Sequence, residues 1–402
     1  MRKNYDIIVC GAGIMGIALA RELKATNSKL SVLVLEKEDR VGLHASGRNS
    51  GVLHAGFYYS PDSLKAKFCR EGNLAIKQIC DHHRIPIRNT GKVVVTKNLE
   101  EDARLVSLYK RGLENKVPLE LLERSYLNKI EPLAVTNEIF LWSPSTSVTS
   151  PELLLQALQY EAGVLGVEFR FAVTNFKLLS ENQMLLGEEE IGFRHFINAA
   201  GSHADNIAKK FDVEHEFEML PFIGRYISVN EANLKLNTLV YPVPHKSNPF
   251  LGVHFTLTSD GETKIGPTAA LALGRESYSI LDGMKDLTSS LEIAQTFSKY
   301  FRHHIMNTSA LMLDELVKMN TRMLVKNAAQ LVPTALEVKG WKSRKPGIRA
   351  QLYNKKKNDF ETDFVVRRGV NSTHLLNIVS PGWTSSIPFA KWVIENEVLP
   401  LL

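Results

Sequence analysis

Cysteine is scarce in this chain of 402 residues, where only Cys10, Cys69 and Cys80 occur and no two of them form a CxxC pair. An odd number without that spacing argues against a disulfide framework and against a thiolate metal site. It fits a reducing, cytoplasmic compartment. No stretch reaches about 18 uninterrupted apolar residues, so we expect no membrane-spanning helix. The apolar run near Met1 ends at Gly11, which is too short for a secretory signal.

Acidic residues are slightly outnumbered, with 43 Asp and Glu against 49 Lys and Arg, and the excess is spread along the chain. The sequence has no nucleic-acid-binding motif and no basic segment interleaved with aromatic residues, so we expect no nucleic-acid partner. A solvated basic surface is the simplest interpretation of the charge. Attraction of a small anionic substrate, or of the inner face of an anionic membrane, are the alternatives.

The content of 44% hydrophobic and 23% charged residues is that of an ordinary globular protein, and the length favours two domains. Residues 5–10 and 31–36 read as buried parallel strands, with helical spacing between them, which predicts a right-handed βαβ unit. The strand, turn and helix order recurs near residue 200 and near residue 380. Between these stretches the pattern changes to short strands, over 217–270, and to helices, over 99–132 and 284–330.

The pattern predicts an α/β fold, α+β over the whole chain, built from two discontinuous domains. We expect a Rossmann-type nucleotide-binding domain from residues 1–86, 150–216 and 347–402. A second domain, an antiparallel β-sheet that carries the substrate site, would take residues 87–149 and 217–346.

The strongest motif is GAGIMG, in which Gly11, Gly13 and Gly16 stand between the first strand and the first helix. This spacing permits a tight turn, the approach of a pyrophosphate to the backbone, and close packing of helix on strand. The phosphate would lie at the positive end of the helix dipole. Glu36 ends the second strand, where a carboxylate can accept hydrogen bonds from ribose hydroxyls. A dinucleotide therefore binds here.

Residues 44–59, HASGRNSGVLHAGFYY, favour FAD over NAD as that dinucleotide. An NAD-binding unit usually continues from its second strand into another helix. Here a long, polar, glycine-bearing loop follows instead, as is needed to wrap an extended dinucleotide and reach its ring.

The chain resembles the D-amino-acid oxidase-like family of FAD-dependent oxidoreductases, and within it the L-2-hydroxyglutarate dehydrogenase/oxidase group. The resemblance runs along nearly the whole chain. It is carried by the segments GAGIMGIALARELK, VLEKE, RNSGVLHAGFYYSPDSLKAKFCREGN, TGKVVV, NAAGSHADNIA, YPVPHKSNPFLGVHFTLTSDGETKIGPTA, GIRAQ and SPGWTSSIPFA.

The resemblance implies a set of FAD-binding residues beyond the three glycines and Glu36. They lie along the pyrophosphate, the flavin and the adenine, and around the start of the C-terminal helix. They are Ile14, Met15, Lys37, Ser46, Arg48, Asn49, Ser50, Gly51, Val52, Val173, Ala200, Gly201, Pro381, Gly382, Thr384 and Ser385. A helix N-terminus beside the flavin would stabilise the negative charge of its reduced form. Taken alone, Thr384 and Ser385 also read as a plain helix cap.

The resemblance also implies the catalytic residues. His54 and His254 are the acid/base candidates, because a histidine with a near-neutral pKa can take up the hydroxyl proton of a 2-hydroxy acid. Arg349 offers a bidentate fork for a carboxylate. Tyr59, Tyr226 and Tyr241 could add hydroxyl contacts, although a tyrosine with a polar tip is more often a core residue.

Two positions depart from the group. Arg48 stands where the group typically has histidine. The group's arginine, followed by glycine and an acid, is replaced by Ile223, Gly224 and Arg225. Positions 223 and 225 of a strand share one face, so Arg225 could bind the distal carboxylate of the substrate.

The sequence thus predicts FAD-dependent oxidation of a small anionic 2-hydroxy acid, L-2-hydroxyglutarate in the first place. Oxidation of an amine or amino acid on the same scaffold is the alternative, and a flavin-binding regulatory protein without turnover is the alternative of another class. Oxygen, a quinone and an electron-transfer protein all stay open as electron acceptors, and no metal is expected.

Overall fold

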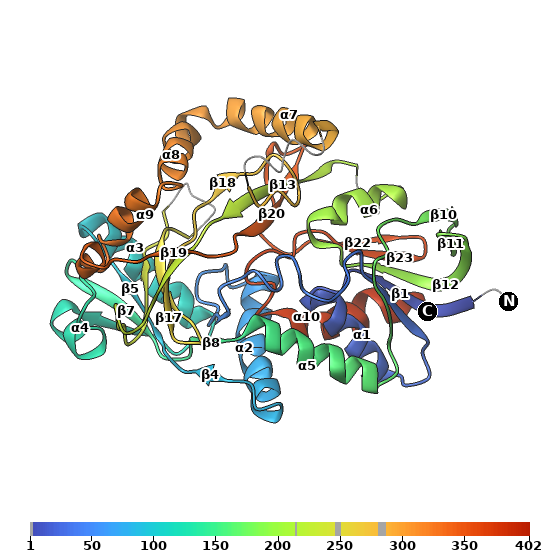
Figure 1. Cartoon of the computed structure of the whole chain (residues 1–402), viewed down its shortest axis with the longest axis horizontal. Coiled ribbons are helices and arrows are strands. Elements are labelled where there is room, and N and C mark those ends of the chain that lie inside the picture. Colours follow the sequence, from blue (N-terminus) through green and yellow to red (C-terminus); the bar gives the residue numbers. More distant parts are fainter. Residues whose placement is uncertain (1–2, 214, 246–250, 280–286) are drawn as a thin grey trace.

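The computed structural model describes residues 3–213, 215–245, 251–279 and 287–402. Two large sheets lie at opposite ends of the long axis, and the two chain termini lie together at one of those ends (Figure 1). Within the described ranges, each helix is too short or too polar to cross a membrane.

The sheet beside the termini is built on β1 (Lys3–Cys10), the apolar N-terminal run. β1 pairs in parallel with β2 (Val32–Leu35) on one side and with β12 (Glu189–Asn198) on the other. The order is β10-β11-β12-β1-β2-β9, and β23 and β22 extend it from β12. These further strands are β9 (Glu168–Arg170), β10 (Lys177–Ser180), β11 (Gln183–Leu186), β22 (Val366–Gly369) and β23 (Ser372–Leu375). The predicted Rossmann-type fold is confirmed, and its sheet contains strands from three separate stretches of the chain.

Both faces of this sheet are buried, as continuous apolar strands require. Along β2, Val32 and Val34 belong to one core and Leu33 and Leu35 to another. The first core is completed by a helical layer in which α1 packs on α5 and α10, and α10 on α2 (Figure 1). The helices of this region are α1 (Ile14–Thr26), α2 (Leu64–His82), α5 (Pro151–Val164), α6 (Ala204–Lys210) and α10 (Ser386–Val393). Short 3-10 helices are η1 (Gly201–His203), η3 (Pro333–Leu336) and η5 (Leu399–Leu401), and η4 (Ile394–Val398) is a π-helix.

The second large sheet joins segments that are far apart in the sequence. β5 (Lys92–Val95) and β15 (Leu239–Pro242) pair in parallel, and the other pairs of the order β19-β14-β17-β16-β15-β5-β7-β6 are antiparallel. The remaining strands are β6 (Glu120–Glu123), β7 (Ile139–Ser143), β14 (Ile227–Asn230), β16 (His254–Leu257), β17 (Glu262–Gly266) and β19 (Lys342–Ser343). The predicted turn at residues 259–261 connects β16 to β17.

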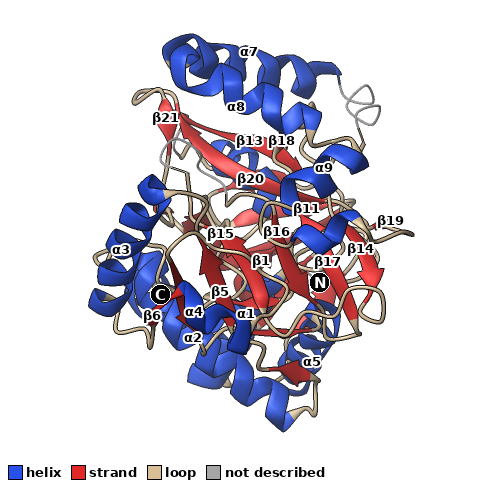
Figure 2. Cartoon of the chain, turned by 90° about the vertical axis from the view of Figure 1, so that its left-hand side faces the viewer, coloured by secondary structure: helices blue, strands red, loops and turns tan. Residues whose placement is uncertain are grey.

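Two smaller sheets link the large ones. β13 (Phe217–Gly224) and β20 (Gly347–Asn354) pair along their whole length, so β20, expected with the nucleotide-binding region, joins a strand of the other region. β18 (Ala270–Leu271) and β21 (Asp359–Phe360) flank them. Helices α7 (Leu287–His303) and α8 (Ile305–Val317) cover this sheet, and α9 (Thr321–Ala328) contacts β17 (Figure 2). β3 (Val52–Leu53), β4 (Ile87–Arg88) and β8 (Ser147–Thr149) form the three-stranded sheet.

The prediction of one helical run over 99–132 is wrong. The structure has α3 (Leu99–Glu114), then β6, then α4 (Arg124–Ile130). Lys116 has a φ of 55°, outside the helical region, and Pro118 disfavours the helical conformation of the residue before it. The helix therefore ends well before Pro132.

Candidate active site

The glycine motif makes a turn that side chains would block. A Cβ on Gly11, whose φ is 106°, would lie 2.6 Å from the carbonyl oxygen of Ala199. A Cβ on Gly16 would lie 1.8 Å from the carbonyl oxygen of Gly11. Gly13 is the N-cap of α1 and has no side chain that could bond to the first N–H groups of the helix. A Cβ at this position would lie 3.0 Å from Ser46 Oγ. The start of α1, which includes Ile14 and Met15, is thus shaped for close approach by an anion.

Glu36 lies at the end of β2 beside this turn and is buried. Its Oε2 accepts from the N–H of Ala12 at 2.7 Å, and its Oε1 from the N–H of Glu38 at 3.1 Å. The N–H of Val173 donates to the carbonyl of Glu36 at 2.9 Å. The predicted ribose carboxylate and the predicted adenine neighbour are therefore adjacent.

The polar loop after β2 folds back on the glycine turn. Ser46 Oγ accepts from the N–H of Ile14 at 2.9 Å, and Asn49 Oδ1 accepts from the N–H of Gly51 at 2.8 Å. The Arg48 side chain turns away from α1, because Nε donates to the Leu43 carbonyl at 2.7 Å and the guanidinium stacks on the Tyr278 ring. Lys37 also points outward, to carboxylate oxygens of Glu38 and Glu276, each at 2.6 Å.

A second helix N-terminus approaches the loop from the C-terminal segment. Thr384 Oγ1 donates to the Val52 carbonyl at 3.2 Å and lies 3.3 Å from the N–H of His54. Ser385 is the N-cap of α10, but its side chain caps no backbone N–H. Its hydroxyl and that of Ser386 are buried with no hydrogen-bond partner among the described residues. Pro381 and Gly382 precede this turn. Ala200 and Gly201 stand at the start of η1, where the Cα of Ala200 would lie 3.3 Å from a Cβ on Gly11.

His54 directly follows β3, and Asn73 Nδ2 donates to its carbonyl at 3.2 Å. Although part of the residue is accessible, the Nδ1 atom is buried and has no hydrogen-bond partner in the described part of the chain. Burial, together with the charges of Lys92 and His254, lowers the pKa of His54 well below its usual value. A neutral imidazole with a free nitrogen can accept a proton.

His254 stacks on Tyr241 with ring centroids 3.8 Å apart. Its Nδ1 lies 2.7 Å from the carbonyl oxygen of Gly252, so Nδ1 carries the proton and Nε2 is the acceptor of the neutral ring. Burial lowers the pKa of His254 to about 3, with smaller contributions from Lys92 and Arg349. Both predicted histidines are thus neutral and belong to one group of residues.

Arg349 lies on β20 opposite Phe222 and donates to the Thr268 carbonyl at 3.3 Å. Tyr226 contacts both Arg349 and Ser50, and burial raises the pKa of the Tyr226 hydroxyl. Burial also raises the pKa of Tyr59, whose hydroxyl is hydrogen-bonded to Ser380. Both phenols are neutral donors at physiological pH.

Arg225 is the predicted substrate residue whose side chain leads elsewhere. Its guanidinium contacts the carbonyl of Met319, the hydroxyl of Thr321 at 2.9 Å and that of Ser343 at 3.0 Å. These three oxygens belong to the segment around α9 and to β19 rather than to the histidine group.

Lys92, which the sequence reasoning missed, is the first residue of β5 and is fully buried. Its Nζ lies 4.2 Å from the centroid of the Tyr241 ring and has no hydrogen-bond partner among the described residues. Burial lowers its pKa to about 7. The available signal was a lysine at the head of the all-apolar run VVV, because lysine is almost never buried unless paired.

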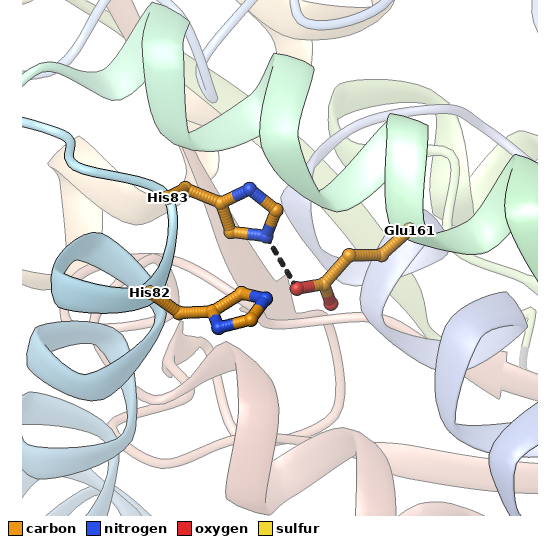
Figure 3. A group of neighbouring side chains, drawn as sticks. All are labelled: His82, His83 and Glu161. Carbon is orange, nitrogen blue, oxygen red and sulfur yellow. Dashed lines mark hydrogen bonds and ion pairs between the residues drawn. The ribbon is translucent and has the colours of Figure 1, made fainter.

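Two clusters outside this site resemble metal ligand sets: His82, His83 and Glu161, and Glu38, His44 and Glu276. In the first, His83 Nε2 lies 2.5 Å from Glu161 Oε1 (Figure 3). Arg21 contacts the other carboxylate oxygen of Glu161. In the second, Lys37 and His203 share Glu276. Ion pairing accounts for both arrangements.

The model of one protein family, described as FAD dependent oxidoreductase, matches residues 6–396. The chain belongs to that family. An L-2-hydroxyglutarate dehydrogenase of Nematostella vectensis, named as mitochondrial, is 34% identical over 98% of this chain and 90% of its own. One of Salmonella houtenae is 32% identical over 98% and 93%.

Solved structures show the same fold for this FAD-dependent oxidoreductase. An L-alpha-glycerophosphate oxidase of Mycoplasma pneumoniae with FAD bound has a TM-score of 0.76 at 23% identity, covering 98% of this chain and 94% of the other. A glycine oxidase of Geobacillus kaustophilus has a TM-score of 0.73 at 17% identity, with the same coverage. The predictions of the fold, of an enzyme and of FAD as cofactor are confirmed.

The residues present fit FAD. The tight turn before α1 requires glycine, because a Cβ on Gly11 or Gly16 would collide with a backbone carbonyl, and the buried carboxylate of Glu36 lies beside this turn, where a ribose would bind. At the start of α10, two buried serine hydroxyls have no hydrogen-bond partner among the described residues. Orphaned buried hydroxyls are costly, and a polar ligand between the two helix N-termini would satisfy them.

Proposed function

We propose that this enzyme oxidises L-2-hydroxyglutarate to 2-oxoglutarate. The observation that carries the proposal is the similarity, at 30 to 34% identity and over nearly the full length of both chains, to several L-2-hydroxyglutarate dehydrogenases. The composition of the site supports it, since neutral imidazoles and a guanidinium are what oxidation of an anionic hydroxy acid requires.

The reaction removes two electrons and two protons from the substrate. FAD, when bound, accepts a hydride from the carbon that bears the hydroxyl. We assign uptake of the hydroxyl proton to His54, because its Nδ1 is unpartnered within the described residues and its backbone is bonded to Thr384, at the start of α10. His254 Nε2 is the second candidate base.

Arg349 is the proposed ligand of the carboxylate next to the reacting carbon. A guanidinium binds a carboxylate through two parallel hydrogen bonds, which fixes the plane of the substrate. Tyr226, Tyr59 and Tyr241 are proposed to add neutral donors around the substrate, since burial raises the pKa of each.

We propose that FAD is bound by the glycine turn, Glu36, the loop over 46–52 and the starts of η1 and α10. In this proposal Lys37 and Arg48 act indirectly, because their side chains anchor the loop to Glu276 and Tyr278. The domain division, with residues 1–86, 150–216 and 347–402 holding FAD, is part of the same proposal. In support of this division, β20 of the first region pairs with β13 of the second, and Arg349 lies within that pair of strands.

An anaerobic substrate panel tests the proposal. L-2-hydroxyglutarate should bleach the flavin of the purified enzyme rapidly, whereas D-2-hydroxyglutarate, glycine and L-proline should not. The variant His54→Gln should bind FAD normally and be reduced at least about 100-fold more slowly, because a general base typically contributes that much. Rapid bleaching by an amino acid instead would replace the proposal by its alternative, an amino-acid oxidase.

Readmitting air to the reduced enzyme identifies the electron acceptor. Return of the yellow colour within seconds indicates oxygen, and return only after addition of a quinone or an electron-transfer protein indicates that partner. We propose a cytoplasmic location, supported by three free cysteines, and contact with a membrane face if a quinone is the acceptor. Cell fractionation checks both.

A further inference from the structure

Among the described residues, nothing pairs with the buried amine of Lys92 in this site. Lys92 is fully buried, and no hydroxyl, carboxylate or carbonyl of the described residues accepts from its Nζ. A buried ammonium without a hydrogen-bond partner is costly and rare in proteins. A site that retains one is built for a ligand that supplies the missing negative charge.

The surroundings of Lys92 are aromatic rather than acidic. Its Nζ lies 5.4, 5.1 and 4.2 Å from the ring centroids of Phe57, Tyr58 and Tyr241. The rings hold the amine in place by cation–π attraction but accept no hydrogen bond of ordinary strength. The Tyr58 hydroxyl beside it is also buried and unpartnered among the described residues. A carboxylate would satisfy the amine and the phenol together.

Lys92 belongs to the same site as the residues assigned to the reaction. Its charge acts on both His54 and His254. The charge of Arg349, on β20 in the neighbouring sheet, also affects the pKa of Tyr241 and of His254, whose rings are stacked. Lys92 and Arg349, which belong to two different sheets, therefore both lie near this pair of rings.

We propose that Lys92 binds the distal carboxylate of the substrate, while Arg349 binds the carboxylate beside the reacting carbon, so that the enzyme selects 2-hydroxy acids with two carboxylates. This inference rests on the proposed function and deepens it. The assignment of the two ends follows from the chain: Arg349 contacts Tyr226, which reaches the cofactor loop at Ser50, whereas Lys92 starts a strand of the other sheet.

Lys92 thus takes the role that the sequence suggested for Arg225. The guanidinium of Arg225 already has three oxygen partners outside the histidine group. The amine of Lys92 has none among the described residues, so a carboxylate that binds there supplies its first hydrogen-bond partner.

The test compares ligands that differ only in the distal carboxylate. Glutarate and pentanoate are titrated into the FAD-loaded enzyme, with the flavin absorbance as the measure of binding, and L-2-hydroxyglutarate and L-2-hydroxypentanoate are compared as reductants. In Lys92→Met, affinity for glutarate should fall about 10- to 100-fold, the value of a charge-assisted hydrogen bond. Affinity for pentanoate should change by less than about threefold. Lys65→Met, which also replaces a buried lysine of lowered pKa, should alter neither.

Equal losses for glutarate and pentanoate in Lys92→Met, or no loss for either, would overturn the inference. Selective loss in Arg225→Met instead would return the role to Arg225. If Lys92→Met does not retain FAD, Lys92→Gln, which keeps a hydrogen-bond donor without the charge, gives the same comparison. A wild-type enzyme that binds glutarate through Lys92 but is not reduced by L-2-hydroxyglutarate would refute the proposed function and would leave only the carboxylate site at Lys92 standing.

Discussion

Some residues of this site lower the stability of the folded protein because their chemical role requires a buried polar group, and Lys92 is the clearest example. Its pKa is lowered from 10.5 to about 7 by burial, so folding must hold an amine where a charge is unwelcome. Because the folded-state pKa lies below the unfolded one, the folded protein loses stability as the pH falls from about 10.5 to about 7. Below that range the cost is constant.

Lys92→Met should therefore raise the free energy of unfolding at pH 7.5, by on the order of 4 kcal/mol. Methionine has a similar length and needs no hydrogen bond. Urea unfolding of the FAD-loaded protein measures the difference, which should shrink as the pH is raised toward 10. A variant less stable than the wild type at pH 7.5 would contradict this account of the residue.

Residue by residue, the sequence predicted most of what the structure brings together. His54 follows β3, His254 and Tyr241 lie on β16 and β15, and Arg349 lies on β20, so residues from three sheets meet in one group. Their motifs flank turns and strand ends, where local pattern is informative. The run VVV after Lys92 signals that the lysine is buried, but its position beside Tyr241 depends on the pairing of β5 with β15, which no local pattern of the sequence reveals.

At the scale of elements, the turn between β1 and α1 is the part most tightly specified by sequence. Three glycines fix it because the carbonyls of Ala199 and Gly11 occupy the places where two of the Cβ atoms would stand. The helical run predicted over 99–132 failed for the opposite reason. The strand β6 pairs with β7, and that tertiary contact outweighed a helical pattern already interrupted at Pro118.

Gly16→Ala should lose FAD without unfolding the chain as a whole. The new Cβ would meet the Gly11 carbonyl at 1.8 Å, so the turn must shift and the helix start must move. We expect at least a tenfold weaker affinity for FAD, measured as flavin released per chain. Gly163→Ala on α5 is the matched control, because nothing lies within 4 Å of its Cβ, and helix propensity should make it neutral or slightly stabilising. Full flavin content in Gly16→Ala would contradict the assigned role of the turn.

At the scale of the whole molecule, the sheet built on β1 carries buried histidines that make the fold sensitive to acid. His195 on β12 and His374 on β23 are both fully buried, and burial lowers the pKa of each to about 4. The unfolded chain takes up these protons below about pH 6.5, whereas the folded chain does so only near pH 4. Stability is therefore complete above pH 6.5 and falls between pH 6.5 and 4.

The variant His374→Gln should lose less stability than the wild type on acidification. At pH 5 each such histidine costs about 2 kcal/mol relative to neutral pH. Urea midpoints at pH 7.5 and pH 5 should therefore differ less in the variant, by about that amount in free energy. Equal acid sensitivity in the two proteins would show that other groups dominate.

The parallel pairing of β5 with β15 also means that β5 is synthesised well before its partner strand. Val93, Val94 and Val95 emerge from the ribosome long before residues 239–242, which complete the hydrogen bonding of their strand. Until the intervening segments have been synthesised, this apolar strand has an unpaired edge, which can associate with other chains. We therefore expect the chain to depend on chaperones while it is being translated, whereas the folded enzyme itself is stable.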